Sequence, residues 1–126
     1  MIDLKGKKVL VTGASGGIGK AIALELSSSG ADLCLTGRNK SELENLQKII
    51  GVNCQTVISD LSNSEGINNL ADQAQEIMGQ IDILVNNAGI TKDNLFMRMS
   101  EDDWNEVINL NLNSIFKLTK LLIKGM

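Results

Sequence analysis

The sequence predicts an α/β fold in which a parallel sheet lies between two layers of helices, a three-layer αβα arrangement. Apolar runs rich in β-branched residues alternate with stretches of helical periodicity, and four such runs occur, at residues 9–12, 32–36, 54–58 and 83–85. Strands separated by helices of this length need crossover connections, which make neighbouring strands parallel and cover both faces of the sheet. The chain of 126 residues has the usual size of one domain, so residues 1–126 are expected to form a single unit.

Glycines and polar capping residues set the expected limits of the helices. Gly30, Gly51 and Gly79 each follow an apolar periodic stretch, as is typical of the residue after a helix C-terminus. A long last helix is expected from the capping-box pattern at Ser100 onward, with an apolar face formed by Trp104, Ile108, Asn111, Ile115, Leu118 and Leu122. Because no fifth strand follows this helix, we expect a sheet truncated after its fourth βα unit, with an unpaired edge at the fourth strand.

The composition argues against several classes of protein. The chain contains no His and no Tyr, so neither can act within it as a general acid or base. A net charge of −3 argues against a protein that binds nucleic acid or an anionic membrane surface. With no apolar leader and no run of about 18 apolar residues, a cytoplasmic protein is expected. Cys34 and Cys54 lie within apolar strands and are expected to be buried thiols; no disulfide and no metal site is predicted.

A glycine-rich turn follows the first strand and precedes the first helix, with the sequence Thr-Gly-Ala-Ser-Gly-Gly-Ile-Gly at residues 12–19. Gly13 can adopt the tight turn, Gly17 lets the backbone approach a pyrophosphate, and Gly19 lets the helix pack closely on the strand. The N-terminus of the helix offers free N–H groups and a partial positive charge to phosphate. Its place between strand and helix favours nucleotide binding over a flexible turn that binds nothing.

The end of the second strand indicates which nucleotide would bind. An Asp or Glu there would hydrogen-bond a ribose 2′-hydroxyl, whereas an Arg accommodates a 2′-phosphate. This chain has Thr36-Gly37-Arg38 at that point and no acidic residue, which favours NADP(H) over NAD(H). The other interpretation is that Arg38 is a solvated surface side chain.

Polar side chains also follow the third and fourth strands, at the carboxyl edge where open α/β sheets bind ligands. Asp60 could accept a hydrogen bond from an adenine amino group, and the other interpretation is an aspartate that caps a helix or a turn. Asn86 and Asn87 are expected to bridge neighbouring backbone segments more than to take part in chemistry. Ala88-Gly89 leaves room for the ring or the ribose of a ligand.

Asn111 is the most informative polar residue of the long last helix. Its spacing from Ile108 and Ile115 places it within the predicted apolar stripe. A buried amide needs hydrogen-bond partners, so Asn111 either bonds a kinked backbone or holds a water at a site. The sequence leaves both roles open.

Taken together, these motifs resemble the short-chain dehydrogenase/reductase superfamily, and the resemblance covers the whole chain. They are Thr-Gly-x-x-x-Gly-Ile-Gly at 12–19, Asp60-Leu61, Asn86-Asn87-Ala88-Gly89 and Asn111. The run at residues 87–95, followed by Met97-Arg98-Met99, is more specific and resembles the 3-oxoacyl-acyl-carrier-protein reductases of fatty-acid synthesis. The resemblance implies a Rossmann-like subunit, usually in a homotetramer, in which NADPH delivers hydride to a β-ketoacyl thioester on acyl carrier protein.

The resemblance also implies roles for individual residues. Asn111 matches the catalytic Asn of the family, which would hold the water of a proton relay. The residues expected to bind NADP(H) are Gly13 in the turn, Thr12, Ser15, Gly17, Ile18 and Gly19 at the pyrophosphate, Arg38 at the 2′-phosphate, Asp60 and Leu61 at the adenine, and Asn87, Ala88 and Gly89 on the nicotinamide side.

This sequence departs from the family pattern in two respects. The catalytic Ser and the Tyr-x-x-x-Lys of the family have no counterpart as far as Met126, and Gly16 stands where many NADP-dependent relatives have a basic residue. We therefore interpret the chain as the N-terminal part of a 3-oxoacyl-acyl-carrier-protein reductase, inactive as an isolated chain. The alternatives are a non-catalytic nucleotide-binding module and one chain of a split reductase.

Overall fold

Strands and helices alternate along the chain in the order that the sequence predicts. The computed structural model describes residues 2–89 and 96–126. The strands are β1 (Lys8–Val11), β2 (Asp32–Gly37), β3 (Cys54–Ile58) and β4 (Ile83–Val85). The α-helices are α1 (Gly17–Ser28), α2 (Lys40–Ile50), α3 (Ser64–Met78), α4 (Glu101–Ile108) and α5 (Ser114–Leu122).

The strands form one parallel sheet in the order β3-β2-β1-β4, which confirms the predicted fold class. β1 lies inside the sheet, with Val9 paired to Leu33 of β2 on one side and to Ile83 of β4 on the other. The chain runs from β1 to β2 and β3 and then crosses back to place β4 on the opposite side of β1. The carboxyl end of β1 is therefore the point where the strand order reverses, and open α/β sheets bind their ligands at such points.

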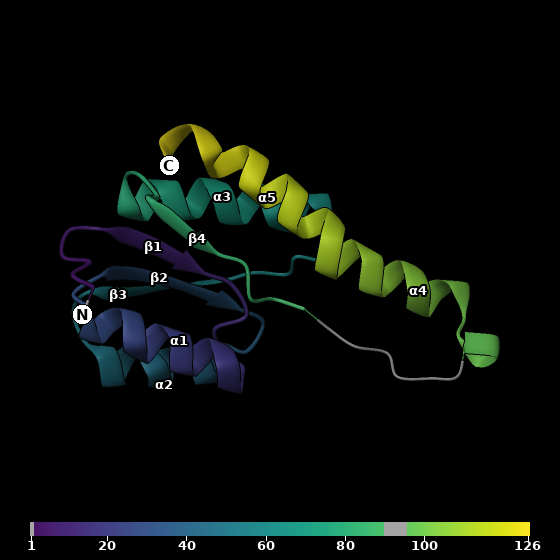
Figure 1. Ribbon diagram of the computed structural model, residues 1–126, viewed down its shortest axis with the longest axis horizontal. Coiled ribbons are helices and arrows are strands. Elements are labelled where there is room, and N and C mark those ends of the chain that lie inside the picture. The colour runs from purple at the N-terminus through teal and green to yellow at the C-terminus, as the bar shows by residue number, and fades with distance from the viewer. Residues whose placement is uncertain (1, 90–95) are drawn as a thin grey trace.

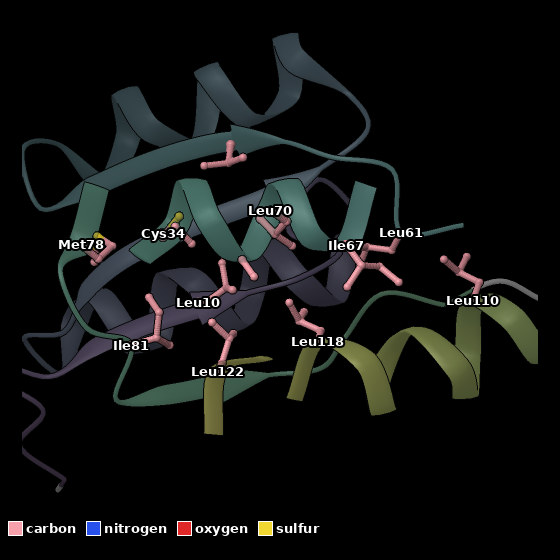
Figure 2. Close-up of a cluster of buried hydrophobic side chains, with 13 residues drawn as sticks. Leu10, Cys34, Leu61, Ile67, Leu70, Met78, Ile81, Leu110, Leu118 and Leu122 are labelled. Carbon is pink, nitrogen blue, oxygen red and sulfur yellow. The ribbon is translucent and has the colours of Figure 1, made fainter. Parts of the chain in front are cut away.

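Helices cover both faces of the sheet, with α1 and α2 on one face and α3 and α5 on the other (Figure 1). Side chains of β1 alternate between these faces, so that Val9 and Val11 belong to the core under α1 and α2. Leu10 points to the other face, where Figure 2 shows it near Leu118 and Leu122 of α5. The β1 side chains from Val9 to Val11 are fully buried, as expected for a strand covered on both faces.

The predicted helix limits at Ser100, Gly51 and Gly79 are confirmed, and the structure adds two N-cap residues that the sequence analysis did not name, Asn39 and Asn63. The side chains of Asn39, Asn63 and Ser100 accept hydrogen bonds from the backbone N–H three residues later, at the N-termini of α2, α3 and α4. Gly51 and Gly79 follow α2 and α3 with φ of 101° and 82°, a left-handed conformation that glycine adopts without strain. These residues fix where α2 and α3 begin and end.

The last helix, which the sequence predicts as one long helix, is interrupted in the structure. A π-helical segment at Asn109–Asn113 separates α4 from α5, so the apolar positions of the two helices do not form one continuous stripe. Leu118 and Leu122 of α5 are buried, as their place on the predicted apolar face requires, and α5 packs against α3. In contrast, α4 buries no residue and Trp104 is 55% exposed. Figure 1 shows why: α4 extends beyond the end of the sheet, away from the described strands and helices that bury α5.

Cys34 and Cys54 are buried free thiols, as predicted. They stand on neighbouring strands but pack into the cores on opposite faces of the sheet. Burial raises the pKa of Cys34 to about 12 and the pKa of Cys54 to about 11, so both are protonated at neutral pH. Within residues 2–89 and 96–126, no helix is long and apolar enough to cross a membrane, and no three His, Cys, Asp or Glu side chains lie together as metal ligands.

Candidate nucleotide-binding site

A cavity of about 380 Å³ opens where the strand order reverses at the carboxyl edge of the sheet. Its walls come from the turn after β1, the ends of β2 and β3, the loop after β4, and the π-helical segment. The lining residues are Gly13, Ser15, Gly16, Gly17, Ile18, Gly19, Thr36, Gly37, Arg38, Ser59, Leu61, Asn87, Ala88, Gly89 and Leu110. The structure thus brings together all of the predicted cofactor-binding residues except Thr12 and Asp60.

Three glycines of the turn have different surroundings. Gly13 has a φ of 63°, and an added β-carbon there would lie 2.9 Å from the Cα of Ala88. A β-carbon on Gly19 would lie 2.1 Å from the carbonyl oxygen of Gly13. Neither Gly13 nor Gly19 therefore has room for a side chain. A β-carbon on Gly17 would meet nothing within 4 Å. The turn is therefore tight at Gly13 and Gly19 and open at Gly17, where a ligand can approach the backbone.

The N-terminus of α1 forms the part of the cavity wall that is suited to bind an anion. Its N-cap residue, Gly16, has no side chain to accept from the first N–H groups, whereas α2, α3 and α4 are each capped by a side chain. The first backbone bond of the helix runs from the N–H of Lys20 to the carbonyl of Gly16 at 2.9 Å. The N–H groups before Lys20 have no acceptor within the helix, and they carry its partial positive charge. This end of α1 can therefore bind phosphate oxygens.

Thr12 lies behind the cavity. It is 1% exposed, and its hydroxyl oxygen accepts hydrogen bonds from the backbone N–H groups of Asn87 and Ala88, both at 3.0 Å. The same hydroxyl donates to the carbonyl of Val85 at 3.3 Å. The structure thus gives Thr12 a role that the sequence did not predict: it holds the loop after β4 against the end of β1.

Asn87 bridges two backbone segments, as the sequence predicts. Its side-chain Nδ2 donates a hydrogen bond to the carbonyl of Gly13 at 3.1 Å, and the residue also lines the cavity. The neighbouring Asn86 is directed elsewhere, with its Nδ2 3.5 Å from the hydroxyl of Thr119 on α5. The glycine turn and the loop after β4 are therefore fixed to each other across the end of the sheet.

Arg38 and Asp60 follow β2 and β3 and are both exposed. Arg38 lines the cavity, as the prediction of a 2′-phosphate contact requires. Asp60 does not line it; its Oδ1 accepts a hydrogen bond from the backbone N–H of Ser62 at 3.0 Å, which is the turn interaction given as the other interpretation. Hydrogen bonds from Ser62 lower the pKa of the Asp60 carboxyl, and the positive charge of Arg38 adds to this shift.

Asn111 lies in the middle of the π-helical segment and is half-buried. Its side-chain Oδ1 would lie 3.0 Å from a β-carbon added to Gly89, so the amide packs against the loop after β4. The hydroxyl of Ser114 donates to the carbonyl of Leu110, within the same distorted turn. The sequence linked Asn111 to a kinked backbone or to a water at a site, and the structure shows the distorted backbone.

The match to known proteins covers nearly the whole chain. The family model of short chain dehydrogenases matches residues 7–126. The chain belongs to the short-chain dehydrogenase family. It is 46% identical over 126 residues to nodulation protein G of Rhizobium sp. (strain N33) and 44% identical over 128 residues to the 3-oxoacyl-acyl-carrier-protein reductase FabG of Pseudomonas aeruginosa. These matches cover 100% and 99% of this chain but 51% and 52% of the relatives, so this short-chain dehydrogenase sequence spans about half of their length.

Solved structures of the same family have the same fold. A short-chain dehydrogenase/reductase from Brucella melitensis superposes with a TM-score of 0.93 at 33% identity, over 99% of this chain and 52% of that one. A 3-ketoacyl-acyl-carrier-protein reductase from Brucella melitensis, in complex with NADH, superposes with a TM-score of 0.91 at 29% identity. That second match covers 98% of this chain and 51% of the neighbour.

Five lining residues of this short-chain dehydrogenase were not among the predicted cofactor-binding residues: Gly16, Thr36, Gly37, Ser59 and Leu110. The hydroxyls of Thr36 and Ser59 are hydrogen-bonded to each other, and the N–H of Ser59 donates to the carbonyl of Gly37 at 3.0 Å. Ser59 directly follows β3, so the rule that selected Asp60 could have selected it as well. Leu110 lies in the π-helical segment; the kinked backbone that the sequence left open for Asn111 did not identify Leu110 as a lining residue.

The cavity of this short-chain dehydrogenase is suited to binding an anionic ligand. Among the described residues, its lining includes the cation Arg38, the hydroxyls of Ser15, Thr36 and Ser59, and no carboxylate. The uncapped helix end and Arg38 both line the cavity, and each offers positive charge to phosphate oxygens. Among these lining side chains no His, Tyr, Asp or Glu stands ready to transfer a proton.

Proposed function

We propose that this chain is the cofactor-binding, N-terminal part of an NADPH-dependent 3-oxoacyl-acyl-carrier-protein reductase. The observation that carries the proposal is the cavity at the carboxyl end of β1, lined by the glycine turn, the uncapped α1 and Arg38. FabG reductases of Pseudomonas aeruginosa and Vibrio cholerae are 44% and 43% identical to this chain, and they are named for this reaction. The family supports oxidoreduction as the chemistry, and these relatives favour a β-ketoacyl thioester as substrate.

The residues around the cavity fit a dinucleotide at three points. Gly17 leaves open space in front of the N–H groups of α1, where a pyrophosphate would bind. Arg38 stands beside this region at the end of β2, where the adenosine ribose and its 2′-phosphate would lie. Asn87 and Gly89 form the far wall, beside β4, on the side proposed for the nicotinamide. The volume of about 380 Å³ is within the usual range of small-molecule sites.

The proposed reaction reduces the β-carbonyl of the acyl chain to a hydroxyl. Bound NADPH would supply the hydride to the carbonyl carbon, and a proton is then required at the carbonyl oxygen. Asn111, beside the loop after β4, is the residue of this chain proposed to hold a water that passes this proton. The side chain that donates it directly is proposed to lie outside these 126 residues, since they contain no Tyr.

The preference for NADPH over NADH is part of the proposal and depends on Arg38. The absence of an acidic side chain at the end of β2 supports it, because a carboxylate would repel a 2′-phosphate. The Brucella melitensis reductase was solved with NADH, which makes the comparison of both cofactors necessary. We also propose the cytoplasm as the location and a homotetramer as the assembly of the whole reductase.

A non-catalytic nucleotide-binding module, or one chain of a split reductase, is the second candidate. This candidate applies if the natural protein that carries this sequence supplies no Tyr-x-x-x-Lys within the same chain. The two candidates predict the same binding of cofactor but differ in turnover. Reduction of an acetoacetyl thioester by the natural protein that carries this sequence supports the reductase, and binding without turnover supports the module.

Calorimetric titration with NADPH tests the binding function directly. Gly17→Val should abolish binding without unfolding the protein, because the space in front of Gly17 is open to solvent and to ligand alone. Glu25→Val is the matched control, since Glu25 is an exposed residue farther along α1 and does not line the cavity. Equal affinity of the parent and of Gly17→Val for NADPH would rule out this cavity as the site.

A further inference from the structure

The backbone hydrogen bonds of the last helical segments change register at Ser114. In a regular α-helix the N–H of Ser114 would donate to the carbonyl of Leu110, four residues earlier. Here this N–H donates to the carbonyl of Asn109, five residues earlier, as in a π-helix. The carbonyl of Leu110 therefore lacks the partner that an α-helix would give it.

The side chain of Ser114 supplies another partner for this carbonyl. Its hydroxyl donates a hydrogen bond to the carbonyl oxygen of Leu110, and both residues are buried, with exposed fractions of 2% and 7%. A serine in a regular helix can make the same bond while its N–H also donates to that carbonyl. At Ser114 the hydroxyl takes the place of the N–H, and without it the π register would leave a buried carbonyl without this donor.

The register determines which side chains reach the cavity. Leu110 lines the cavity, and the Oδ1 of Asn111 lies 3.0 Å from the place of a β-carbon on Gly89. A change to the α register would turn the residues before Ser114 by up to about 100° relative to α5, which is the rotation of one residue in an α-helix. Because buried side chains hold α5 in place, this turn would move Leu110 and Asn111 away from these positions.

Two other features near the segment contribute less to its register. α4 has no buried residue, so its packing does not fix the helical phase before the segment. The Nδ2 of Asn113 donates to the Oδ1 of Asn109 at 2.8 Å, but both side chains are exposed and water competes for this bond. The bond from the Ser114 hydroxyl is buried by contrast, and the loss of a donor is most destabilising in a buried place.

We propose that Ser114 is a positioning residue whose hydroxyl holds the π register and so keeps Asn111 beside the loop after β4. This inference rests on the proposed function, in which Asn111 holds the water that passes a proton to the substrate. Ser114 is not among the residues that line the cavity, and it acts through the backbone of Leu110. Removal of its hydroxyl, as in Ser114→Ala, therefore shifts the helix toward the α register.

Crystal structures of the natural protein that carries this sequence test the register. In Ser114→Ala the N–H of residue 114 should donate to the carbonyl of Leu110, whereas in the parent it donates to the carbonyl of Asn109. Ser28→Ala is the matched control, because the Ser28 hydroxyl bonds the carbonyl of Leu24 at 3.0 Å within the regular helix α1. This control should keep the structure and the kcat of the parent. A Ser114→Ala structure that retains the bond to Asn109 would overturn the proposal.

Kinetics with an acetoacetyl thioester test the positioning of Asn111 in the same protein. Ser114→Ala should lower kcat by about tenfold or more, because the proposed proton relay is displaced. The dissociation constant of NADPH should change by less than about threefold, because the glycine turn and Arg38 belong to other elements. Added to Asn111→Ala, Ser114→Ala should lower kcat by less than about twofold more. A full loss in that background, or equal losses of kcat and of NADPH affinity, would contradict the positioning role.

A second variant decides the question if Ser114→Ala does not fold. Ser114→Thr keeps the hydroxyl, which in a helix can bond the carbonyl four residues earlier. This variant should keep the bond from its N–H to the carbonyl of Asn109 and most of the kcat of the parent. A Ser114→Thr structure in the α register, with its hydroxyl still bonded to Leu110, would show that the hydroxyl does not set the register.

Failure of the proposed function gives a different result. If the parent reduces no acetoacetyl thioester, the proposed function fails and the role of Ser114 in the reaction fails with it. The crystal structures then still show whether the hydroxyl sets the register. If the parent reduces the thioester and Ser114→Ala has the same kcat, the proposed function stands and the positioning role is wrong.

Discussion

The backbone N–H of Ala88 donates a 3.0 Å hydrogen bond to the hydroxyl of Thr12, 76 residues earlier in the chain. This bond joins the loop after β4 to the end of β1, and both segments form the proposed binding cavity. Thr12 is fully buried, so no water replaces its hydroxyl if it is lost. The shape of the cavity thus depends on a residue that does not line it.

Replacing Thr12 by Val should destabilise the protein and weaken cofactor binding. The change keeps the volume of the side chain but leaves the N–H of Ala88 without its acceptor, at a cost of about 1–3 kcal/mol in the free energy of unfolding. Thr12→Ser retains the hydroxyl and should keep most of the stability. Denaturant unfolding of the three proteins checks this, and equal stability of Thr12→Val and the parent would contradict it.

Replacing Arg38 by Ala should weaken NADPH far more than NADH. Only NADPH carries the 2′-phosphate, and a hydrogen bond to a charged group contributes about 1.5–3 kcal/mol, or roughly 10- to 150-fold in affinity. Lys40→Ala is the control, since Lys40 is a nearby exposed cation that does not line the cavity. Titrations that show equal losses for the two cofactors would remove Arg38 from the site.

The two buried thiols should make the protein less stable at alkaline pH. Their pKa values are raised from 9.0 to about 12 for Cys34 and to about 11 for Cys54, chiefly by burial, so the folded state holds these protons more tightly than the unfolded state. Their contribution is therefore complete below pH 9 and is lost as the pH rises toward the folded values, by about 1.4 kcal/mol per pH unit for each thiol.

The slope of stability against pH isolates this effect from packing. Cys34→Ala/Cys54→Ala should have lower stability at neutral pH, because it loses buried volume, but a shallower decline between pH 9 and 11. Denaturant unfolding at a series of pH values gives both quantities. Parallel curves for the parent and the double variant would show that the thiols do not titrate in this range on unfolding.

The isolated 126-residue chain should show no reductase activity toward an acetoacetyl thioester. It contains no Tyr, and proton transfer by a positioned side chain is typically worth about 10²- to 10⁴-fold in rate. Oxidation of NADPH, followed by its absorbance with mass-verified protein, is the measurement. Turnover at an ordinary enzymatic rate would mean that another group of this chain donates the proton.

The sequence predicted the features of this fold that depend on local patterns. Gly51 and Gly79 were recognisable as helix ends because the left-handed conformation after a helix favours glycine whatever its tertiary surroundings. The parallel sheet followed from the lengths of the crossovers, and the position of Arg38 followed from the end of β2. Such signals are contained in a few neighbouring residues.

Features that depend on distant contacts were not predictable in this way. The hydroxyl of Thr12 is hydrogen-bonded to the backbone N–H of Ala88, and the residues next to Thr12 in the sequence do not reveal that partner. The π-helical segment at Asn109–Asn113 changes the helical phase, so a stripe drawn with one period through Trp104 and Leu118 could not hold for both. Leu110 belongs to the same π-helical segment, so a regular helical period did not predict that it lines the cavity.

The last prediction concerns the isolated chain in solution, which should be molten, aggregated or self-associated. In the described part of the chain, β4 pairs on one side alone, and its outer edge carries backbone groups free to pair with another strand. On the outer side of the last helical segments, Leu112, Phe116 and Ile123 are 59%, 66% and 57% exposed. Each large apolar side chain that is buried by association gains about 1.5–3 kcal/mol, which is a large part of a net stability of about 5–15 kcal/mol.

Light scattering after size-exclusion chromatography, together with thermal unfolding, tests this prediction. Phe116→Glu places a charge on the exposed face of α5 without touching the buried side chains Leu118 and Leu122, so it should reduce association through that face. Lys124→Glu is the control, because it introduces the same carboxylate at an exposed position after α5 without removing an apolar side chain. A compact parent monomer with a sharp cooperative transition would contradict the prediction, because it would show that the β4 edge and this apolar face are stable in water without a partner.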